Sequence, residues 1–147
     1  MRKEILDAVI AHQTKLIENI KFAIDTMDTT TDLDEQDTID MDDLSRQSDL
    51  QEDKMKMQEK LTFEQSELRY VRNFLTIDSM EEFDKGAVVE TDKAIFLVGF
   101  AFTPIAHGKK KIFGISANAP VFKNNLGKKQ GDSLQLGEVS HTIEAIY

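Results

Sequence analysis

The 147-residue sequence contains no cysteine and no tryptophan, only two prolines and only seven glycines. Without cysteine, the chain forms no disulfide and no thiolate metal site, and nothing indicates an oxidising compartment. Residues 1–4 lack the apolar core of a signal peptide. The longest strongly apolar run, residues 94–102, is too short to cross a bilayer as a helix. We therefore expect a cytoplasmic protein with no membrane partner.

Acidic residues are concentrated in one part of the chain. The sequence has 27 Asp and Glu against 18 Lys and Arg, which gives a net charge of −9. Eleven of these acids lie between Asp28 and Asp53, where Arg46 is the one basic residue. Such a segment is repelled by nucleic-acid phosphates and attracted to a basic channel, a basic protein surface or divalent cations. The alternative is a solvated segment that only aids solubility.

The first half of the sequence has the spacing of two long helices. Over residues 3–27, apolar side chains recur at helical spacing, and only Gln13 interrupts the stripe. Over residues 42–75, apolar positions recur mostly at sevens, with Lys54 and Glu64 in the seam. Neither stretch contains proline or glycine. We predict an antiparallel coiled-coil hairpin over residues 1–76, with an acidic tip at about residues 28–49.

The second half of the sequence has strand character. Short runs of β-branched and aromatic residues alternate with turn signals, and residues 107–109 fit a connection. Pro120 and Gly127 bracket one short helix over residues 120–125. The predicted fold class is α+β, with the hairpin followed over residues 77–147 by a small, mainly antiparallel β domain. The predicted strands cover residues 87–90, 94–101, 111–115, 133–136 and 141–147.

The C-terminal residues carry a family resemblance. The pattern consists of Ser116, Pro120, Gly127, Lys128, Gly131 and Asp132, with the neighbouring Ile115, Ala119, Leu126 and Lys129 and the closing Ile143 and Ile146. It resembles the C-terminal domain of bacterial Gre-type transcript-cleavage factors (GreA/GreB-like), a domain with an FKBP-like fold. Gly86-Ala87-Val88-Val89 resembles the first strand of that family. A helical hairpin ahead of the domain is similar in architecture, and Asp43-Leu44-Ser45 resembles the start of the family's tip signature.

The resemblance implies a transcription elongation factor that binds RNA polymerase. In the family, the globular domain docks at the rim of the secondary channel and the coiled coil enters the channel. Acidic tip residues then help to hold the second Mg²⁺ of the polymerase, which cuts backtracked RNA. Mg²⁺ prefers oxygen ligands, which is why the tip carries carboxylates. The resemblance thus implies no intrinsic enzyme activity, no cofactor beyond the shared Mg²⁺, no small-molecule substrate and only indirect contact with nascent RNA.

The sequence departs from the family at the tip. Asp43 matches the tip Asp of the family, but Arg46 occupies the position of its tip Glu. An arginine does not ligate Mg²⁺ and opposes it electrostatically. Asp40, Asp42 or Asp49 are the candidate substitutes. A channel-binding modulator or inhibitor that does not stimulate cleavage is therefore the competing interpretation.

Basic residues follow the acidic segment. Lys54, Lys56 and Lys60 are candidates for an RNA-facing patch, because a basic patch on the coiled coil contacts RNA in the family. The alternative is a solvated helix face. The three histidines, His12, His107 and His141, have no metal-ligand spacing, and we expect no stably bound metal.

Two functions of other classes remain open. An FKBP-like fold alone suggests a peptidyl-prolyl isomerase, but the second half lacks tryptophan and the aromatic residues of a proline pocket. A coiled-coil chaperone or scaffold would need an open apolar groove between its helices, whereas a narrow, filled seam argues against it.

Overall fold

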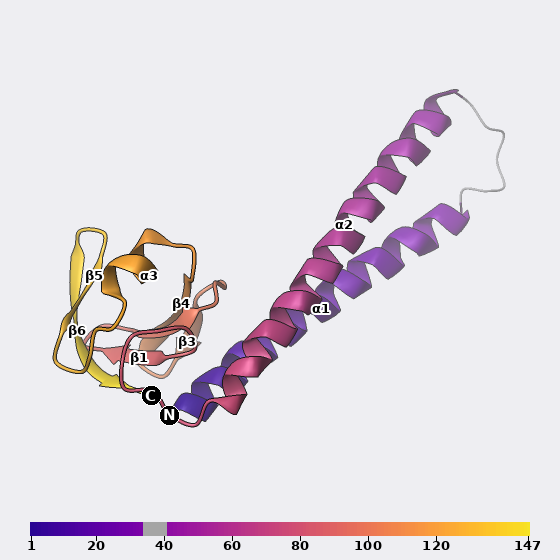
Figure 1. The fold of residues 1–147 in the computed structure, drawn as a ribbon. Coiled ribbons are helices and arrows are strands. Elements are labelled where there is room, and N and C mark those ends of the chain that lie inside the picture. The colour runs from indigo at the N-terminus through magenta and orange to yellow at the C-terminus, as the bar shows by residue number, and fades with distance from the viewer. Residues whose placement is uncertain (34–40) are drawn as a thin grey trace. The chain divides into compact units, whose positions relative to one another are not determined.

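The computed structural model describes residues 1–33 and 41–147, without the side chains of residues 30–33 and 43. Two compact units are present, one formed by Met1–His12 with Tyr70–Tyr147 and the other by Gln13–Arg69. The helices α1 (Arg2–Leu33) and α2 (Met41–Asn73) contribute to both units (Figure 1). A helical hairpin therefore precedes a sheet, and the predicted α+β class is confirmed. The sequence predicted one boundary after residue 76, whereas the sheet-containing unit also includes the first turns of α1.

The helix α1 continues six residues beyond its predicted end at residue 27. Threonine is a weaker helix former than most residues, so the threonines after residue 25 could have ended the helix. Instead, the hydroxyl of Thr26 donates to the main-chain oxygen of Phe22, and that of Thr29 donates to the main-chain oxygen of Asp25, both at 2.9 Å. Bonds to the fourth preceding residue satisfy the hydroxyls within the helix, so threonine does not end it here. The helix α2 ends in a 3₁₀ turn over Phe74–Thr76.

The six strands form a mixed sheet in the order β3-β4-β2-β1-β6-β5. Neighbouring strands are antiparallel except for β2 and β4, which run parallel, so the predicted mainly antiparallel character is confirmed. The strand β3 was not predicted, and the connection expected at residues 107–109 is in part this strand. The strands are β1 (Val88–Thr91), β2 (Ile95–Gly99), β3 (Ile105–His107), β4 (Lys110–Ser116), β5 (Ser133–Leu136) and β6 (Val139–Ile146).

The connection between β2 and β3 crosses closely over Gly114 of β4. A Cβ atom added at Gly114 would overlap the main-chain oxygen of Phe100 and would lie 2.8 Å from the ring of Phe102. Glycine at this position therefore allows the chain to leave β2, cross β4 and return as β3. This crossing places β4 beside β2 in parallel orientation.

The main core lies on the face of the sheet that α3 (Pro120–Asn125) covers. This helix occupies the predicted residues, with Pro120 at its start, and Gly127 just beyond it has a φ of 78°. The carboxamide of Asn125 is buried and ties the helix to β5 through both main-chain groups of Gln135, at 3.1 and 3.2 Å. The buried core residues are Phe83, Ala87, Val89, Ala94, Phe96, Val98, Ile115, Phe122, Leu134 and Ile143.

Arg2 connects the first turn of α1 to three other parts of the sheet-containing unit. Its guanidinium donates to the main-chain oxygens of Phe74 at 2.8 Å, Ile77 at 3.0 Å and Tyr147 at 2.9 Å, and also to that of Gly86. The side chain is buried, and this burial lowers the pKa of Arg2. Segments from both ends of the chain thus meet at one cation.

Candidate functional site: the acidic helical hairpin

A narrow seam joins α1 and α2 within the helical unit, where the two helices lie side by side (Figure 1). The buried positions of α1 are spaced by three or four residues, as in a heptad. Aliphatic side chains line the seam on both helices. Its apolar members are Ile17, Ile20 and Ile24 on α1, which are buried, and Met57, Leu61 and Leu68 on α2, which are half-buried.

Gln13, which interrupts the predicted apolar stripe, is buried in this seam. Its amide nitrogen donates to Glu64 Oε2 at 2.6 Å and to the main-chain oxygen of Glu64 at 3.3 Å. Gln13 and Glu64, which the sequence placed as polar residues in the seams of the two helices, are thus hydrogen-bonded to each other. A buried polar pair of this kind favours one register of the two helices.

Lys54, a candidate RNA-facing residue, is paired within the hairpin. Its ammonium forms an ion pair with Asp28 of α1, and both side chains are partly exposed. Lys56 is paired with Glu52 at 2.8 Å, one turn earlier on α2. Lys60 is exposed. Carboxylates therefore pair with two of the three candidate basic residues.

The predicted tip residues are not all in a turn. Asp42 and Asp49 are exposed on the first turns of α2, and Asp43 lies on the same helix. Asp40 lies outside the described residues. Arg46 is exposed one helical turn from both Asp42 and Asp49, at the spacings that bring side chains to one helix face. The start of α2 thus presents carboxylates with a guanidinium between them.

Charge divides between the two compact units. Residues 13–69 carry sixteen Asp and Glu and seven Lys and Arg, a net charge of −9, whereas the residues of the sheet-containing unit carry eleven of each. The whole net charge of the protein therefore belongs to the helical unit. Within that unit, most of the excess acids occur in the sequence from Asp25 to Asp53.

The family motif at the C-terminus builds turns in the sheet-containing unit. The Ser116 hydroxyl accepts a bond from the Asn118 amide at 3.2 Å ahead of α3. Asp132 Oδ2 accepts a bond from the Lys129 amide at 2.8 Å, and Lys128 Nζ donates to the main-chain oxygen of Ser133. These contacts are local: that of Ser116 lies in the turn before α3, and those of Lys128 and Asp132 lie in the connection between α3 and β5.

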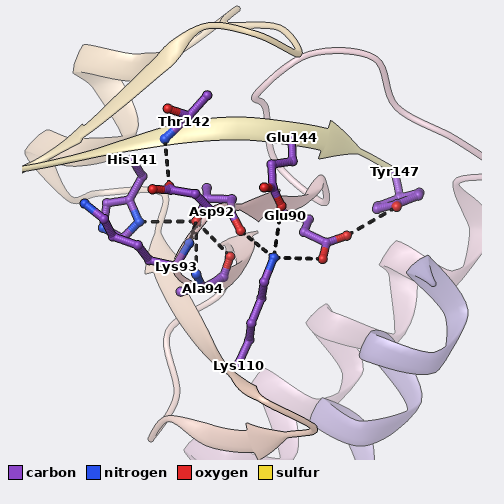
Figure 2. Close-up of polar contacts among 10 residues, drawn as sticks. Glu90, Asp92, Lys93, Ala94, Lys110, His141, Thr142, Glu144 and Tyr147 are labelled. Atoms are coloured by element: carbon purple, nitrogen blue, oxygen red, sulfur yellow. Dashed lines mark hydrogen bonds and ion pairs between the residues drawn. The ribbon is translucent and has the colours of Figure 1, made fainter.

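The sheet carries a polar network that was not predicted from the sequence (Figure 2). Lys110 Nζ lies 3.0 Å from Glu90 Oε1, 3.0 Å from Glu144 Oε2 and 2.6 Å from the main-chain oxygen of Thr91. Burial lowers the pKa of Lys110, but hydrogen bonds with the two glutamates raise it by more, so the net shift is upward. Burial and Glu90 also raise the pKa of Tyr147, whose hydroxyl lies 3.4 Å from Glu90 Oε2. The network links β1, β4 and β6.

A second polar contact lies beside this network. His141 Nδ1 is 3.2 Å from the Thr91 hydroxyl, and its ring meets the edge of Phe96 at 5.4 Å. Burial and the charge of Lys93 lower the pKa of His141, against the opposing effect of Asp92. The imidazole is thus favoured in its neutral form.

The described residues contain neither a metal-binding cluster nor a helix that could span a membrane. In this part of the chain, no three or more His, Cys, Asp or Glu side chains are grouped so that they could hold a metal ion. None of its helices combines the length and apolar character needed to cross a bilayer.

Comparisons with known proteins gave one structural likeness to report. No family model matches the sequence, and no curated protein matches it. The chain is similar in structure to GreA factor homolog 1 of Thermus thermophilus, with a TM-score of 0.35 and 16% sequence identity over 94% of each chain. A likeness at this distance does not assign the chain to a family.

Proposed function

We propose that this chain is an RNA polymerase-binding transcription elongation factor that inserts its helical hairpin into the secondary channel and acts on backtracked or paused complexes. One observation carries the proposal: the net charge of −9 belongs entirely to a two-helix unit, whereas the sheet-containing unit is neutral. The resemblance of the C-terminal motif and of Asp43-Leu44-Ser45 to the Gre-type family supports the same function.

The charge distribution suits a hairpin that enters a basic channel. Opposite charges attract over about 8–10 Å at physiological ionic strength, so a concentrated charge speeds association with a basic entrance. A filled seam and the paired residues Gln13 and Glu64 keep the two helices together as one unit. The chain would supply ligands to the polymerase and would not be an enzyme itself.

A second candidate function is binding without stimulation of RNA cleavage. Asp42 and Asp49 are exposed and can face a metal ion of the polymerase, but Arg46 lies one turn from both. A guanidinium this close opposes a divalent cation and offers it no ligand. This observation favours a modulator that occupies the channel over a factor that stimulates cleavage.

A cleavage assay with purified cognate RNA polymerase on a backtracked complex tests both functions. Wild-type protein is expected to bind the polymerase and to bind less tightly as salt rises. The variant Arg46→Glu is expected to increase cleavage above the wild-type level, because it replaces a cation with a possible Mg²⁺ ligand. Asp42→Asn and Asp49→Asn should reduce whatever cleavage is seen, whereas Glu138→Gln, which removes the same charge from the β5–β6 turn, should not.

Each result has a defined meaning. Binding without cleavage by the wild-type chain supports the modulator. Cleavage stimulated by the wild-type chain and lost in Asp42→Asn supports the cleavage factor. If the wild-type chain does not bind the polymerase at low salt, the proposed function is wrong.

A further inference from the structure

The helix α2 carries apolar side chains on two opposite sides. One side forms the seam with α1. The other side exposes Leu44, Met55 and Phe63, and Met55 and Phe63 retain 62% and 60% of their accessible surface. At about 100° per residue, these three positions lie on the part of the helix surface that faces away from the seam. The seam does not explain them.

Uncharged residues accompany these apolar positions, and the carboxylates of Glu52 and Glu59 fall within the same arc of the helix. We call the apolar and uncharged members of this arc the outer stripe of α2, which consists of Leu44, Ser48, Gln51, Met55, Thr62 and Phe63. All six fall within about a third of the helix circumference. Every one of them is exposed. Exposed side chains as large and apolar as Met55 and Phe63 are not what solubility alone would produce on an acidic hairpin, and Glu52 and Glu59 place carboxylates beside them.

Part of the outer stripe is hollowed. An open groove of about 590 Å³ lies along α2 and contains Met55, Thr62 and Phe63. Gln58, Ser66 and the carboxylate of Glu59 complete its lining. An aromatic ring and a thioether beside a groove are typical of surfaces that another protein covers, because both give large apolar contact.

The charge of the hairpin restricts what the outer stripe can bind. Nucleic acid is disfavoured, because the stripe offers no basic group to a phosphate and the surrounding unit is acidic. A second copy of this chain is also disfavoured, because it would place two units of charge −9 side by side.

The size of the outer stripe argues against a helix-on-helix dimer as well. From Leu44 to Phe63 the stripe is about 29 Å long, and a strip about 10 Å wide gives roughly 300 Å² per partner. A stable interface needs about 800 Å² per partner. The partner must therefore also contact the flanks of the helix, as a concave surface on the partner would.

We infer that the outer stripe of α2 is a docking surface for an apolar protein groove bordered by basic side chains. The apolar floor of that groove covers Met55 and Phe63, and its basic borders face the acidic flanks of the hairpin. This inference rests on the proposed function, and the groove belongs to the RNA polymerase.

Binding of stripe variants to purified cognate core RNA polymerase tests the inference. The double variant Met55→Gln/Phe63→Gln keeps the net charge and helix-compatible side chains and removes the two large apolar groups. We expect its Kd to rise by about tenfold or more, as for residues at the centre of an interface. The matched control is Phe22→Gln on α1, where an equally exposed ring (74%) is removed, and we expect a change below about threefold.

A salt series separates the apolar contact from the charge. Between about 0.05 and 0.3 M salt, the Kd of each protein should rise, but the ratio of variant to wild-type Kd should stay constant because apolar burial is not screened. Helical circular dichroism and the unfolding midpoint of the double variant should match the wild type, since both residues are exposed.

Three results would overturn the inference, and they are distinguishable. If wild type binds and the double variant binds equally well, the outer stripe is not the docking surface and the proposed function stands. If wild type does not bind polymerase, the proposed function fails and the inference fails with it. If sedimentation shows a wild-type dimer that the double variant abolishes, the occupant is a second copy.

Discussion

Replacing Arg2 by methionine should destabilise the sheet-containing unit by about 3–5 kcal/mol, because several main-chain oxygens then lack a donor and each such buried acceptor costs about 1–3 kcal/mol. Arg2 is only 8% exposed, and its guanidinium reaches four main-chain oxygens. Each hydrogen bond to a charged donor contributes about 1.5–3 kcal/mol, but the four are not additive because the free guanidinium regains its hydration in the unfolded chain. Methionine keeps much of the apolar stem and donates nothing.

The conservative substitution Arg2→Lys distinguishes geometry from charge. An ammonium is a compact group at the end of a flexible stem and cannot reach oxygens of Phe74, Ile77 and Tyr147 that a planar guanidinium spans. Lysine should therefore recover only part of the loss, with a destabilisation of about 2 kcal/mol.

Urea unfolding followed by tyrosine fluorescence measures this effect selectively. The sequence has no tryptophan, and both tyrosines, Tyr70 and Tyr147, belong to the sheet-containing unit. The control Lys3→Met removes an exposed positive charge at the next helix position. A loss of 3–5 kcal/mol should also lower the melting temperature by about 10 °C or more. The reasoning is refuted if Arg2→Met and Lys3→Met agree within about 0.5 kcal/mol.

Two further substitutions test the seam and the sheet. Gln13→Leu should destabilise the helical unit by about 1–2 kcal/mol because Glu64 loses its partner, and the double variant Gln13→Leu/Glu64→Leu should recover most of that loss in thermal unfolding followed by circular dichroism. A double variant as unstable as the single one would contradict the pairing. The pKa of His141 is lower in the folded chain than in the unfolded chain. As the pH falls below about 6.5, the unfolded chain therefore binds more protons than the folded chain, and the free energy of unfolding decreases. The decrease ends once the pH is below the pKa of the folded chain. His141→Gln should therefore flatten the fall in urea midpoint between pH 8 and 5, and a slope equal to that of the wild type would contradict this account.

The helices and the short α3 were predictable because their signals are local. Heptad spacing marked both helices, and Pro120 with Gly127 marked the ends of α3. The end of α1 was missed because the sequence does not show that threonine hydroxyls such as Thr29 bond within the helix. The strand β3 was missed because three half-buried or exposed residues have no detectable alternation.

The contacts that assemble the sheet-containing unit could not be predicted. Glu90, Lys110 and Glu144 lie on three different strands, and no local pattern indicates that they meet. The acceptors of Arg2 are main-chain oxygens. Because every residue has a main-chain oxygen, the side chains in the sequence do not indicate which residues accept these hydrogen bonds. The outer stripe of α2 was overlooked because one seam already accounted for the heptad spacing.

The contact between Arg2 and Tyr147 spans 145 positions of the sequence, and it bears on how the chain folds as it is made. The helical unit is one continuous segment, residues 13–69, so all of its residues have been synthesised before the strands are made. The strand β1 lies between β2 and β6, so the sheet is incomplete until residue 146 has been synthesised. Until then, one edge of β1 has unpaired main-chain groups, which invite pairing with other chains. Synthesis thus yields the charged hairpin first, and its net charge of −9 repels neighbouring chains while that edge is open.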